Sequence, residues 1–284
     1  MALTINTNIA SLNAQRRLGQ STSDLRQSYE RLSSGLRIVR SRDDAAGLAI
    51  ADTLKSDQRI ASVAIRNAND GVSLISIADG ALNEIGNVLQ RMGELAEQSA
   101  NGTLSATHRS ALQNEFASLG SEVSRIARTT TFNGIQLLSG GNAVALQVGF
   151  DSGANSQISF SGVNGTLESL GLGTGNEVLN FSVNAAGTAG ATAALSALDA
   201  VKAGISSLTT NRGTLGAAES RLNVAINNLQ VARENFASAE SQIRDVDVAE
   251  EAAKLTRLNI LQQAGASVLA QANQQPSLAL SLLG

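Results

Sequence analysis

Side chains that could perform catalysis or hold a metal ion are scarce in this chain of 284 residues. The sequence has no cysteine and a single histidine, His108. It therefore excludes thiol chemistry, disulfides and metal sites built from cysteine or histidine clusters. It also contains no glycine-rich phosphate loop ending in Lys-Ser/Thr, no HExxH zinc motif and no GxSxG nucleophile elbow. We expect a protein that is not an enzyme and that carries no catalytic residue, metal or cofactor.

Carboxylates occur as two adjacent pairs, Asp43-Asp44 and Glu250-Glu251. Adjacent residues do not share a helical face, so neither pair is arranged for joint acid–base chemistry. We interpret both pairs as solvated helix caps or helix faces, and His108 as a surface residue near the start of a helix. Asp43-Asp44 suits the beginning of a helix, where carboxylates meet the positive end of the helix dipole.

Two tripeptides, Asn101-Gly102-Thr103 and Asn164-Gly165-Thr166, match the pattern for N-glycosylation. The pattern is short, and Asn-Gly is also a common turn dipeptide. We therefore interpret both tripeptides as ordinary turns.

The elements that carry these residues are long helices, and the clearest is a coiled-coil seam over residues 50–96. Apolar or small residues recur there at alternating steps of four and three, and Asp57 alone interrupts the series. A repeat held over more than six heptads predicts one long helix packed against others. The seam positions are Ile50, Leu54, Asp57, Ala61, Ala64, Ala68, Gly71, Ile75, Ala78, Leu82, Ile85, Leu89, Met92 and Ala96.

Two further seams predict two more helices. Val201 and Leu208 share the phase of the second seam, so its helix is expected to begin near residue 192. The third helix is expected to start after Asn101-Gly102, with Ser105 as its N-cap. The second seam comprises Leu215, Ala218, Leu222, Ala225, Leu229, Ala232, Phe236, Ala239, Ile243, Val246, Glu250 and Ala253. The third comprises Leu112, Phe116, Leu119, Val123 and Ile126.

The composition changes between residues 129 and 201. This span has no Lys or Arg, and it holds 12 of the 26 glycines and four of the six phenylalanines. Ala143–Phe150 and Gln157–Phe160 are predicted strands, with Asp151–Ser156 as the turn between them. We expect residues 129–191 to form a small, β-hairpin-rich central segment of a mainly α protein. A flexible linker is the alternative.

Both chain ends carry apolar helical stripes, which we predict to be assembly seams. Stripes on such distant segments, joined through long helices, are fully buried only by lateral packing. We expect residues 1–42 and 244–284 to be terminal helices that are disordered in the monomer and become ordered on assembly. Residues 43–243 then form a helical rod domain. The stripes are Leu18, Leu25 and Leu32, and Leu258, Leu261, Val268 and Leu269.

Charge and hydropathy exclude several kinds of partner. The formal net charge is −3. Residues 1–42 hold seven Arg and two acids but only one aromatic residue, Tyr29, which argues against a nucleic-acid-binding arm. No stretch approaches the roughly 20 apolar residues of a transmembrane helix. The first residues lack the pattern of a cleavable secretory signal, so we expect a cytoplasmic protein or one exported without signal cleavage.

Several long motifs near both ends resemble the bacterial flagellins, over roughly residues 1–140 and 205–284. The amino-terminal motifs are Ile5-Asn6-Thr7-Asn8, Arg31-Leu32-Ser33-Ser34-Gly35-Leu36-Arg37-Ile38, Asp43-Asp44-Ala45-Ala46-Gly47-Leu48-Ala49-Ile50, Arg66-Asn67-Ala68-Asn69-Asp70-Gly71, Gly80-Ala81-Leu82-Asn83-Glu84-Ile85 and Phe132-Asn133-Gly134. The carboxy-terminal motifs are Asn259-Ile260-Leu261-Gln262-Gln263-Ala264-Gly265 and Leu269-Ala270-Gln271-Ala272-Asn273.

This resemblance implies a structural subunit that polymerises with itself into the extracellular flagellar filament used for swimming. The two terminal segments would pair in the filament core, and the short middle segment implies that large outer domains are absent. It further implies unfolded export through the flagellar type III apparatus, a cytoplasmic export chaperone, and contact with the filament cap and hook-junction proteins.

The resemblance also implies a recognition site. Residues 89–96 and 113–115 are similar to the flagellin patch bound by the vertebrate Toll-like receptor that senses flagella, and Arg91, Leu95 and Glu115 match its main contact positions. Arg91 and Leu95 are four residues apart and so share a helical face. Gly93 departs from the pattern, because many receptor-active members have an arginine there.

Two other functions fit part of the pattern. A hook–filament junction protein has similar ends, although the Asn259–Gly265 motif favours the filament subunit. An intracellular coiled-coil adaptor, from a different functional class, would explain the heptads but not the apolar residues 278–283.

Overall fold

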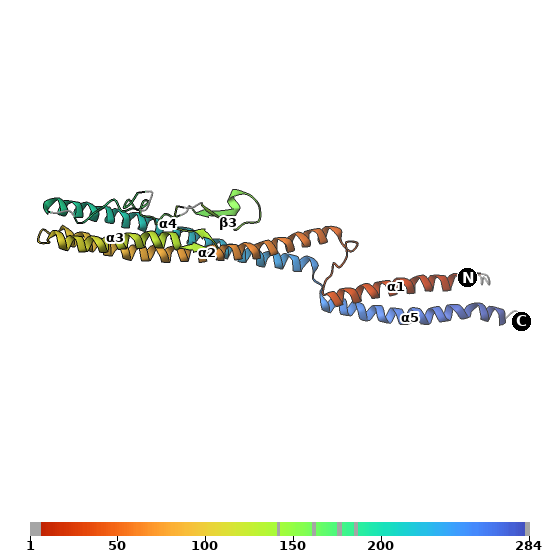
Figure 1. The fold of residues 1–284 in the computed structure, drawn as a ribbon. Coiled ribbons are helices and arrows are strands. Elements are labelled where there is room, and N and C mark those ends of the chain that lie inside the picture. Colours follow the sequence, from red (N-terminus) through yellow and green to blue (C-terminus); the bar gives the residue numbers. More distant parts are fainter. Residues whose placement is uncertain (1–6, 141–142, 161–162, 175–177, 185–186, 282–284) are drawn as a thin grey trace. The chain divides into compact units, whose positions relative to one another are not determined.

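The computed structural model describes residues 7–140, 143–160, 163–174, 178–184 and 187–281, with side chains up to residue 274. The described elements confirm the predicted mainly α fold with small hairpins (Figure 1). In chain order they are α1 (Ile9–Ser34), α2 (Ala45–Ala100), α3 (Ala106–Thr129), β1 (Thr131–Phe132), β2 (Ile135–Gln136), β3 (Val144–Gln147), a 3-10 turn (Ala154–Ser156), β4 (Gln157–Phe160), α4 (Gly187–Arg244) and α5 (Val248–Ser281).

The chain divides into two compact units, which are described separately. Unit 1 comprises residues 1–58 and 234–284, and unit 2 comprises residues 59–233. Unit 1 therefore holds α1, α5, the first part of α2 and the last part of α4. Unit 2 holds the rest of α2 and α4, all of α3, and the hairpins.

Helix ends follow local hydrogen-bonding rules. Asn8 caps α1 by accepting a 3.0 Å hydrogen bond from the N–H of Ser11, and Gly35 ends it in the left-handed conformation with φ 71°. Asp44 accepts a 2.9 Å bond from the Gly47 N–H at the start of α2. Ser105 caps α3, as predicted.

The heptad seam of α2 forms the central line of unit 2. Every seam position from Ala61 to Ala96 is buried, and Leu82, Ile85, Leu89 and Met92 are fully enclosed. Ile50, in unit 1, differs because it remains 54% exposed. At this end an ion pair of 3.2 Å between Asp52 and Arg244 joins α2 to the end of α4.

Helices α3 and α4 both pack against α2 within unit 2 (Figure 1). Small residues allow the close approach of α4: a methyl group placed on Gly86 or Gly93 would lie 3.5 Å from Leu208 or 3.6 Å from Val201. Phe116 of α3 is fully buried in the same core. The core therefore runs along the helices as a line of mostly aliphatic contacts.

The central segment begins with two short hairpins that follow α3. Strands β1 and β2 are joined by Asn133 and Gly134, both with positive φ, the conformation that Asn-Gly favours in two-residue hairpin turns. Strands β3 and β4 pair antiparallel with Leu146 opposite Ile158. Leu146 lies directly over Gly71 of α2, where an added methyl group would overlap its side chain. The absence of a side chain at Gly71 therefore allows the β3–β4 hairpin to pack closely against α2.

The segment 178–184 is fixed across α2 and α3 at one residue. The N–H of Val183 donates to Gln113 of α3 at 2.6 Å, and its carbonyl accepts a 2.5 Å bond from Ser99 of α2. The Val183 side chain is fully buried. This part of the central segment is therefore tied to the helices, in contrast to the flexible-linker alternative.

Several predicted boundaries were wrong. Helix α4 begins at Gly187 rather than near residue 192, and β3 spans only Val144–Gln147 of the predicted strand Ala143–Phe150. The Gln147 side chain donates to the Asp151 carbonyl at 2.6 Å. The second seam continues in phase through Val246, but α4 ends at Arg244. Asp247 then caps α5, accepting from the Ala249 N–H at 2.9 Å.

The buried seam makes a prediction that a matched pair of substitutions can test. Leu89 is 0% exposed on α2, whereas Leu195 of α4 is 49% exposed in the same unit. Leu89→Ala should reduce the free energy of unfolding by about 2–5 kcal/mol, because it leaves a cavity. Leu195→Ala should change it by less than about 1 kcal/mol. Urea unfolding of the full chain followed by circular dichroism measures both, and equal losses would contradict the described core.

Candidate assembly and recognition surfaces

Helices α1 and α5 lie side by side and antiparallel in unit 1, with the two chain ends at the same end of the pair (Figure 1). The Asn8 side-chain amide donates to the Ala272 carbonyl at 2.7 Å, and Ser11 Oγ donates to Asn273 Oδ1 at 2.6 Å. Further along, a methyl group added to Gly265 would lie 3.3 Å from Leu18. These contacts set the register of the pair.

A buried polar cluster joins the same two helices near the other end of α1. Ser28 Oγ donates to a carboxylate oxygen of Glu251, and Arg31 lies 3.9 Å from the other oxygen. Lys254 adds a 3.5 Å ion pair. Glu251 is only 7% exposed, so its interpretation as a solvated face was wrong. Its carboxylate is buried because it has these partners on both helices.

The predicted seam residues are covered unequally by this pairing. Leu25 and Leu258 are 8% exposed, and Leu18, Leu32 and Leu269 are half-buried. Leu261 and Val268 remain 49% and 53% exposed. The apolar residues 278–283 lie outside the described side chains.

An apolar groove of about 520 Å³ runs along the pair beside these exposed residues. We call it the α1–α5 groove. It is lined by Ala10, Asn13, Ala14, Arg17, Leu18, Ser21, Leu261, Ala264, Gly265 and Val268. Further apolar side chains stand exposed on the two helices: Ile9 at 61%, Leu12 at 57%, Val248 at 61% and Ile260 at 61%. The pair therefore presents uncovered apolar surface on both helices.

The connection from α1 to α2, residues 35–44, is held at Asp43. Its carboxylate accepts hydrogen bonds from the Val39 and Arg40 N–H groups at 3.3 and 3.1 Å and from the Gln27 side chain at 3.0 Å. Burial opposes ionisation, but these backbone bonds and the charges of Arg31 and Arg42 outweigh it and lower the pKa of Asp43. Asp43 therefore stabilises the conformation of the connection through these hydrogen bonds, whereas Asp44 is the residue that caps α2.

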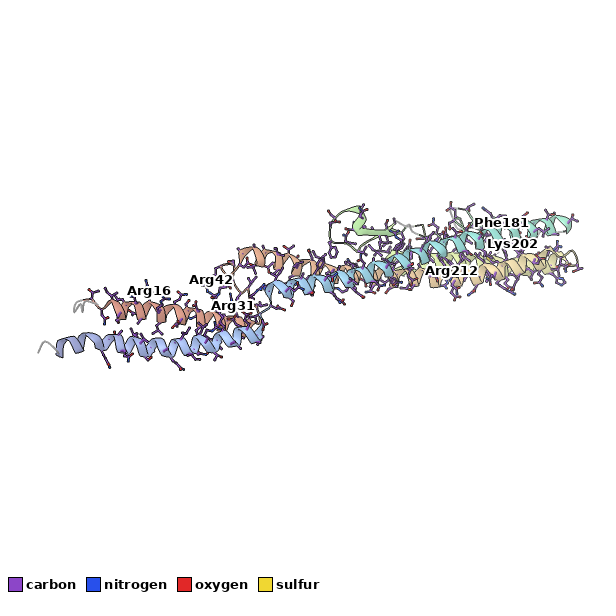
Figure 2. All side chains as sticks on the ribbon, turned by 180° about the vertical axis from the view of Figure 1, so that it is seen from behind. Arg16, Arg31, Arg42, Phe181, Lys202 and Arg212 are labelled. Carbon is purple, nitrogen blue, oxygen red and sulfur yellow. The ribbon has the colours of Figure 1, made fainter. Side chains whose placement is uncertain are left out.

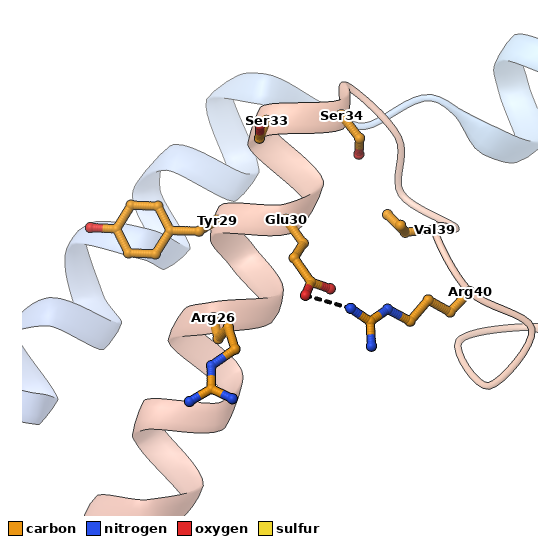
Figure 3. Close-up of a pocket in the computed structure, with 7 residues that line it drawn as sticks. All are labelled: Arg26, Tyr29, Glu30, Ser33, Ser34, Val39 and Arg40. Carbon is orange, nitrogen blue, oxygen red and sulfur yellow. Dashed lines mark hydrogen bonds and ion pairs between the residues drawn. The ribbon is translucent and has the colours of Figure 1, made fainter.

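The same connection forms one wall of a shallow pocket of about 510 Å³ (Figure 3). Arg40 pairs with Glu30 of α1 at 2.6 Å across it, and Tyr29 is 52% exposed at its rim. The backbone also joins the connection to the segment before α5, since the Arg37 N–H donates to the Arg244 carbonyl at 2.6 Å.

In unit 2, charged pairs fix helix register. Arg212 of α4 is labelled in Figure 2. It donates to both carboxylate oxygens of Asp79 of α2 at 2.7 and 3.1 Å and to Asn83 at 3.2 Å. The hydrogen bonds to Asp79 raise the pKa of Arg212. A two-pronged pair of this kind adds geometric specificity, so it aligns α4 along α2.

The predicted receptor-contact residues are only partly on the surface. Arg91 of α2 bonds Glu115 of α3 at 2.9 Å and Glu94 at 2.8 Å, and all three side chains are about half exposed or more. Hydrogen bonds to Glu94 and then Glu115 raise the pKa of Arg91. Leu95 is 1% exposed, so its side chain does not form part of the exposed surface around Arg91. Leu95 lies on the buried side of α2 and belongs to the core of unit 2.

Gly93 faces α4, where an added methyl group would contact Val201 at 3.6 Å. His108 is exposed, as predicted. Within the described residues, no group of three or more His, Asp or Glu side chains is arranged to hold a metal ion.

Comparison with known proteins assigns the family. Residues 5–143 match the model of the bacterial flagellin N-terminal helical region, and residues 198–283 match the bacterial flagellin C-terminal helical region. The chain belongs to the bacterial flagellins. It is 42% identical over 280 residues to a flagellin of Halalkalibacterium halodurans, covering 98% of this chain and 99% of that one. It is 41% identical over 304 residues to the flagellin of Bacillus subtilis strain 168, with the same coverage.

As a flagellin, the chain is a structural protein, a subunit of the extracellular flagellar filament. A solved flagellar hook-associated protein of Vibrio parahaemolyticus shares the fold, with a TM-score of 0.59 at 12% identity over 72% of this chain and all of that one. Among the described residues, no helix is both long and apolar enough to cross a bilayer.

Sequence reasoning missed the polar residues that hold this flagellin together. Glu251, Arg212 and Arg109 find their partners more than 70 positions away, and a single sequence carries no signal for such pairs. Capping and turn rules did not identify the role of Asp43, because they concern N–H groups that follow an aspartate, whereas Asp43 accepts from the preceding Val39 and Arg40 N–H groups.

Asp43 makes the stability of the connection depend on pH. Because its pKa is lowered on folding, the stabilisation is complete above the ordinary value of about 3.9 and is lost as the pH falls through the lower folded value. Asp43→Asn should therefore lower the melting temperature at pH 7, and the difference from the wild type should shrink below about pH 4.

Thermal melting of the full chain from pH 2 to pH 8 measures this difference. Glu97→Gln, on an exposed side chain of α2, serves as the control and should leave the melting curve unchanged at pH 7. A constant gap between Asp43→Asn and the wild type at every pH would contradict the assigned role.

Proposed function

We propose that this flagellin polymerises through the α1–α5 pair, and that neighbouring copies cover the α1–α5 groove in the filament core. The observation that carries the proposal is the large exposure of Leu261 and Val268 beside that groove. Exposed apolar patches of this kind mark interaction surfaces. The two helices are long enough to offer the surface along their whole length.

The energetics support a shared core. Ordering a residue costs about 1–2 kcal/mol of conformational entropy, and the two helices contain 26 and 34 residues. Fully burying a leucine or valine side chain contributes about 1.5–3 kcal/mol. The α1–α5 pair buries few large side chains by itself. Contacts with other copies must therefore supply most of the burial free energy that offsets the entropy cost of ordering the two helices.

We also propose the division expected from the sequence: residues 1–42 and 244–284 order on polymerisation, and residues 43–243 form a rod that is folded before assembly. The continuous buried core of α2, α3 and α4 supports an independently stable rod. The sparse burial on α1 and α5 supports terminal segments that need partners.

Charge placed in the α1–α5 groove should block assembly without unfolding the rod. Leu261→Asp and Val268→Asp put carboxylates on side chains that are already half exposed, so the free chain should tolerate them. In the polymer, each carboxylate would be buried without a partner, which is strongly unfavourable. We expect at least a tenfold loss of seeded filament growth, measured by light scattering and electron microscopy.

Gln263→Asp is the matched control, because Gln263 is exposed on α5 and does not line the groove. It should assemble at close to the wild-type rate. Normal filaments from Leu261→Asp and Val268→Asp would contradict the proposed surface. Seeded growth also separates a filament subunit from a hook–filament junction protein, which should not extend a filament.

The remaining partners follow from the family alone. We propose swimming motility as the filament's use, unfolded export through the flagellar type III apparatus, an export chaperone, and contact with the cap and hook-junction proteins. The absence of cysteine is consistent with passage as an unfolded chain into an oxidising exterior.

We propose a second interaction, with the vertebrate flagellin-sensing Toll-like receptor, through Arg91 and Glu115. Their exposure and mutual hydrogen bond give a charged surface across α2 and α3. Leu95 would act by packing beneath them. Gly93 departs from the pattern of many receptor-active flagellins, and it faces α4.

Receptor activity would depend on the Arg91 guanidinium. Arg91→Ala should reduce the response of receptor-expressing reporter cells at least tenfold, because it removes the central charge of the patch. Its stability should change by less than about 1 kcal/mol, since exposed ion pairs contribute little. Arg125→Ala, which breaks an exposed pair with Glu122 on α3, is the control. An inactive wild-type protein would overturn the receptor proposal and leave the filament proposal untouched.

A further inference from the structure

Three Asn-Gly steps occur in the chain, at Asn101-Gly102, Asn133-Gly134 and Asn164-Gly165. All three lie in the described part of unit 2, and the structure holds each one differently. Asparagine followed by glycine is open to attack by its own backbone, since glycine has no side chain to hinder the approach.

At Asn101, the side-chain oxygen already accepts hydrogen bonds, and in the part of the chain that the structure describes the backbone nitrogen that would attack is not engaged in one. The side-chain oxygen Oδ1 accepts hydrogen bonds from the Thr103 N–H at 3.1 Å and from Thr103 Oγ1 at 3.0 Å. The Gly102 N–H has no acceptor among the described residues, and Gly102 is exposed with open space around it. We propose that Asn101 is a site of spontaneous deamidation in the folded protein.

The reaction uses only the chain and water. The Gly102 nitrogen attacks Cγ of Asn101, its proton passes to solvent, and the new N–Cγ bond closes a five-membered ring. The Cγ–Nδ2 bond then breaks, and the amide group leaves as ammonia after taking a proton from solvent. Water opens the succinimide at either carbonyl to give aspartate or isoaspartate. One water is consumed, one ammonia is released, and nothing is oxidised or reduced.

Thr103 favours this step through the charge that develops on Oδ1. As Cγ becomes tetrahedral, Oδ1 becomes an oxyanion, and donors already directed at that oxygen stabilise the transition state. The backbone N–H and the hydroxyl of Thr103 are two such donors on one atom. The turn therefore supplies a small oxyanion hole to its own asparagine.

The other two steps lack this combination. The Gly165 N–H donates to the Leu138 carbonyl at 2.8 Å, so the nitrogen that would attack Asn164 is engaged, and Gly165 is buried. Gly134 has a free N–H within the described hairpin, but no donor contacts the Asn133 side chain there. The structure thus orders the rates with Asn101 fastest and Asn164 slowest.

Deamidation at Asn101 would also affect the buried guanidinium of Arg109, which bonds the Asn101 carbonyl. Arg109 of α3 is 2% exposed and donates to the Asn101 carbonyl at 3.2 Å and to the Gly187 carbonyl at 2.8 Å. An isoaspartate reroutes the main chain through the former side chain, which displaces the carbonyl that Arg109 holds. The product should therefore loosen the junction of α2, α3 and α4.

The test is peptide mapping by mass spectrometry of the full-length folded chain, incubated at pH 8 and sampled over time. Asn101 should convert several times faster than Asn133 and Asn164. Thr103→Val removes the hydroxyl donor and should slow Asn101 about 2- to 10-fold, whereas Thr103→Ser keeps the hydroxyl and should retain the rate. Gly102→Ala, which fits the open space, should also slow it.

The same incubation in denaturant separates fold from sequence. There the three sites should react at similar rates, because only the local Asn-Gly chemistry remains. Equal rates at Asn101 and Asn164 in the folded chain, or no effect of Thr103→Val, would overturn the proposal. Because it rests on unit 2 alone, its failure would not affect the filament role, and filament failure would not affect it.

Discussion

A long helix with an apolar stripe must cover that stripe with something other than water, and this requirement organises the whole chain. In unit 2 the requirement is met internally, because α3, α4 and the β3–β4 hairpin bury the α2 seam from Ala61 to Ala96. In unit 1 the described contacts meet it only in part. Leu25 and Leu258 are buried, but Leu261 and Val268 stay half exposed beside an apolar groove. The same physical rule that completes the rod leaves the terminal helices in need of neighbours.

Polar contacts decide how these helices align, because aliphatic stripes slide easily along one another. Arg212 fixes α4 against α2 through both oxygens of Asp79, and Glu251 joins α5 to α1 through Ser28 and Arg31. Asp43 holds the connection between α1 and α2 through backbone N–H groups. Hydrophobic burial supplies the stability of the rod, and a few well-placed hydrogen bonds supply its register.

The sequence was sufficient for the parts of the fold that depend on local periodicity. The α2 seam, the Ser105 cap and the β3–β4 hairpin follow from spacing, capping chemistry and alternation within short windows. The seam alone does not show the break between α4 and α5, because the heptad phase continues through Val246, while the Asp247 cap starts a new helix. Glu251 was interpreted as solvated, and the burial of Leu95 was not foreseen, for a related reason. Spacing says which residues share a face, but only the packing of distant segments says which face is covered.

The central claim, that α1 and α5 need neighbouring copies whereas the rod does not, is tested most directly by hydrogen exchange on the monomer and on seeded filaments. The account predicts that backbone amides of residues 9–34 and 248–274 exchange rapidly in the monomer and become protected in the filament. The α2 amides of residues 74–96 should be protected in both states. Terminal helices that are as strongly protected in the monomer as in the filament would contradict it.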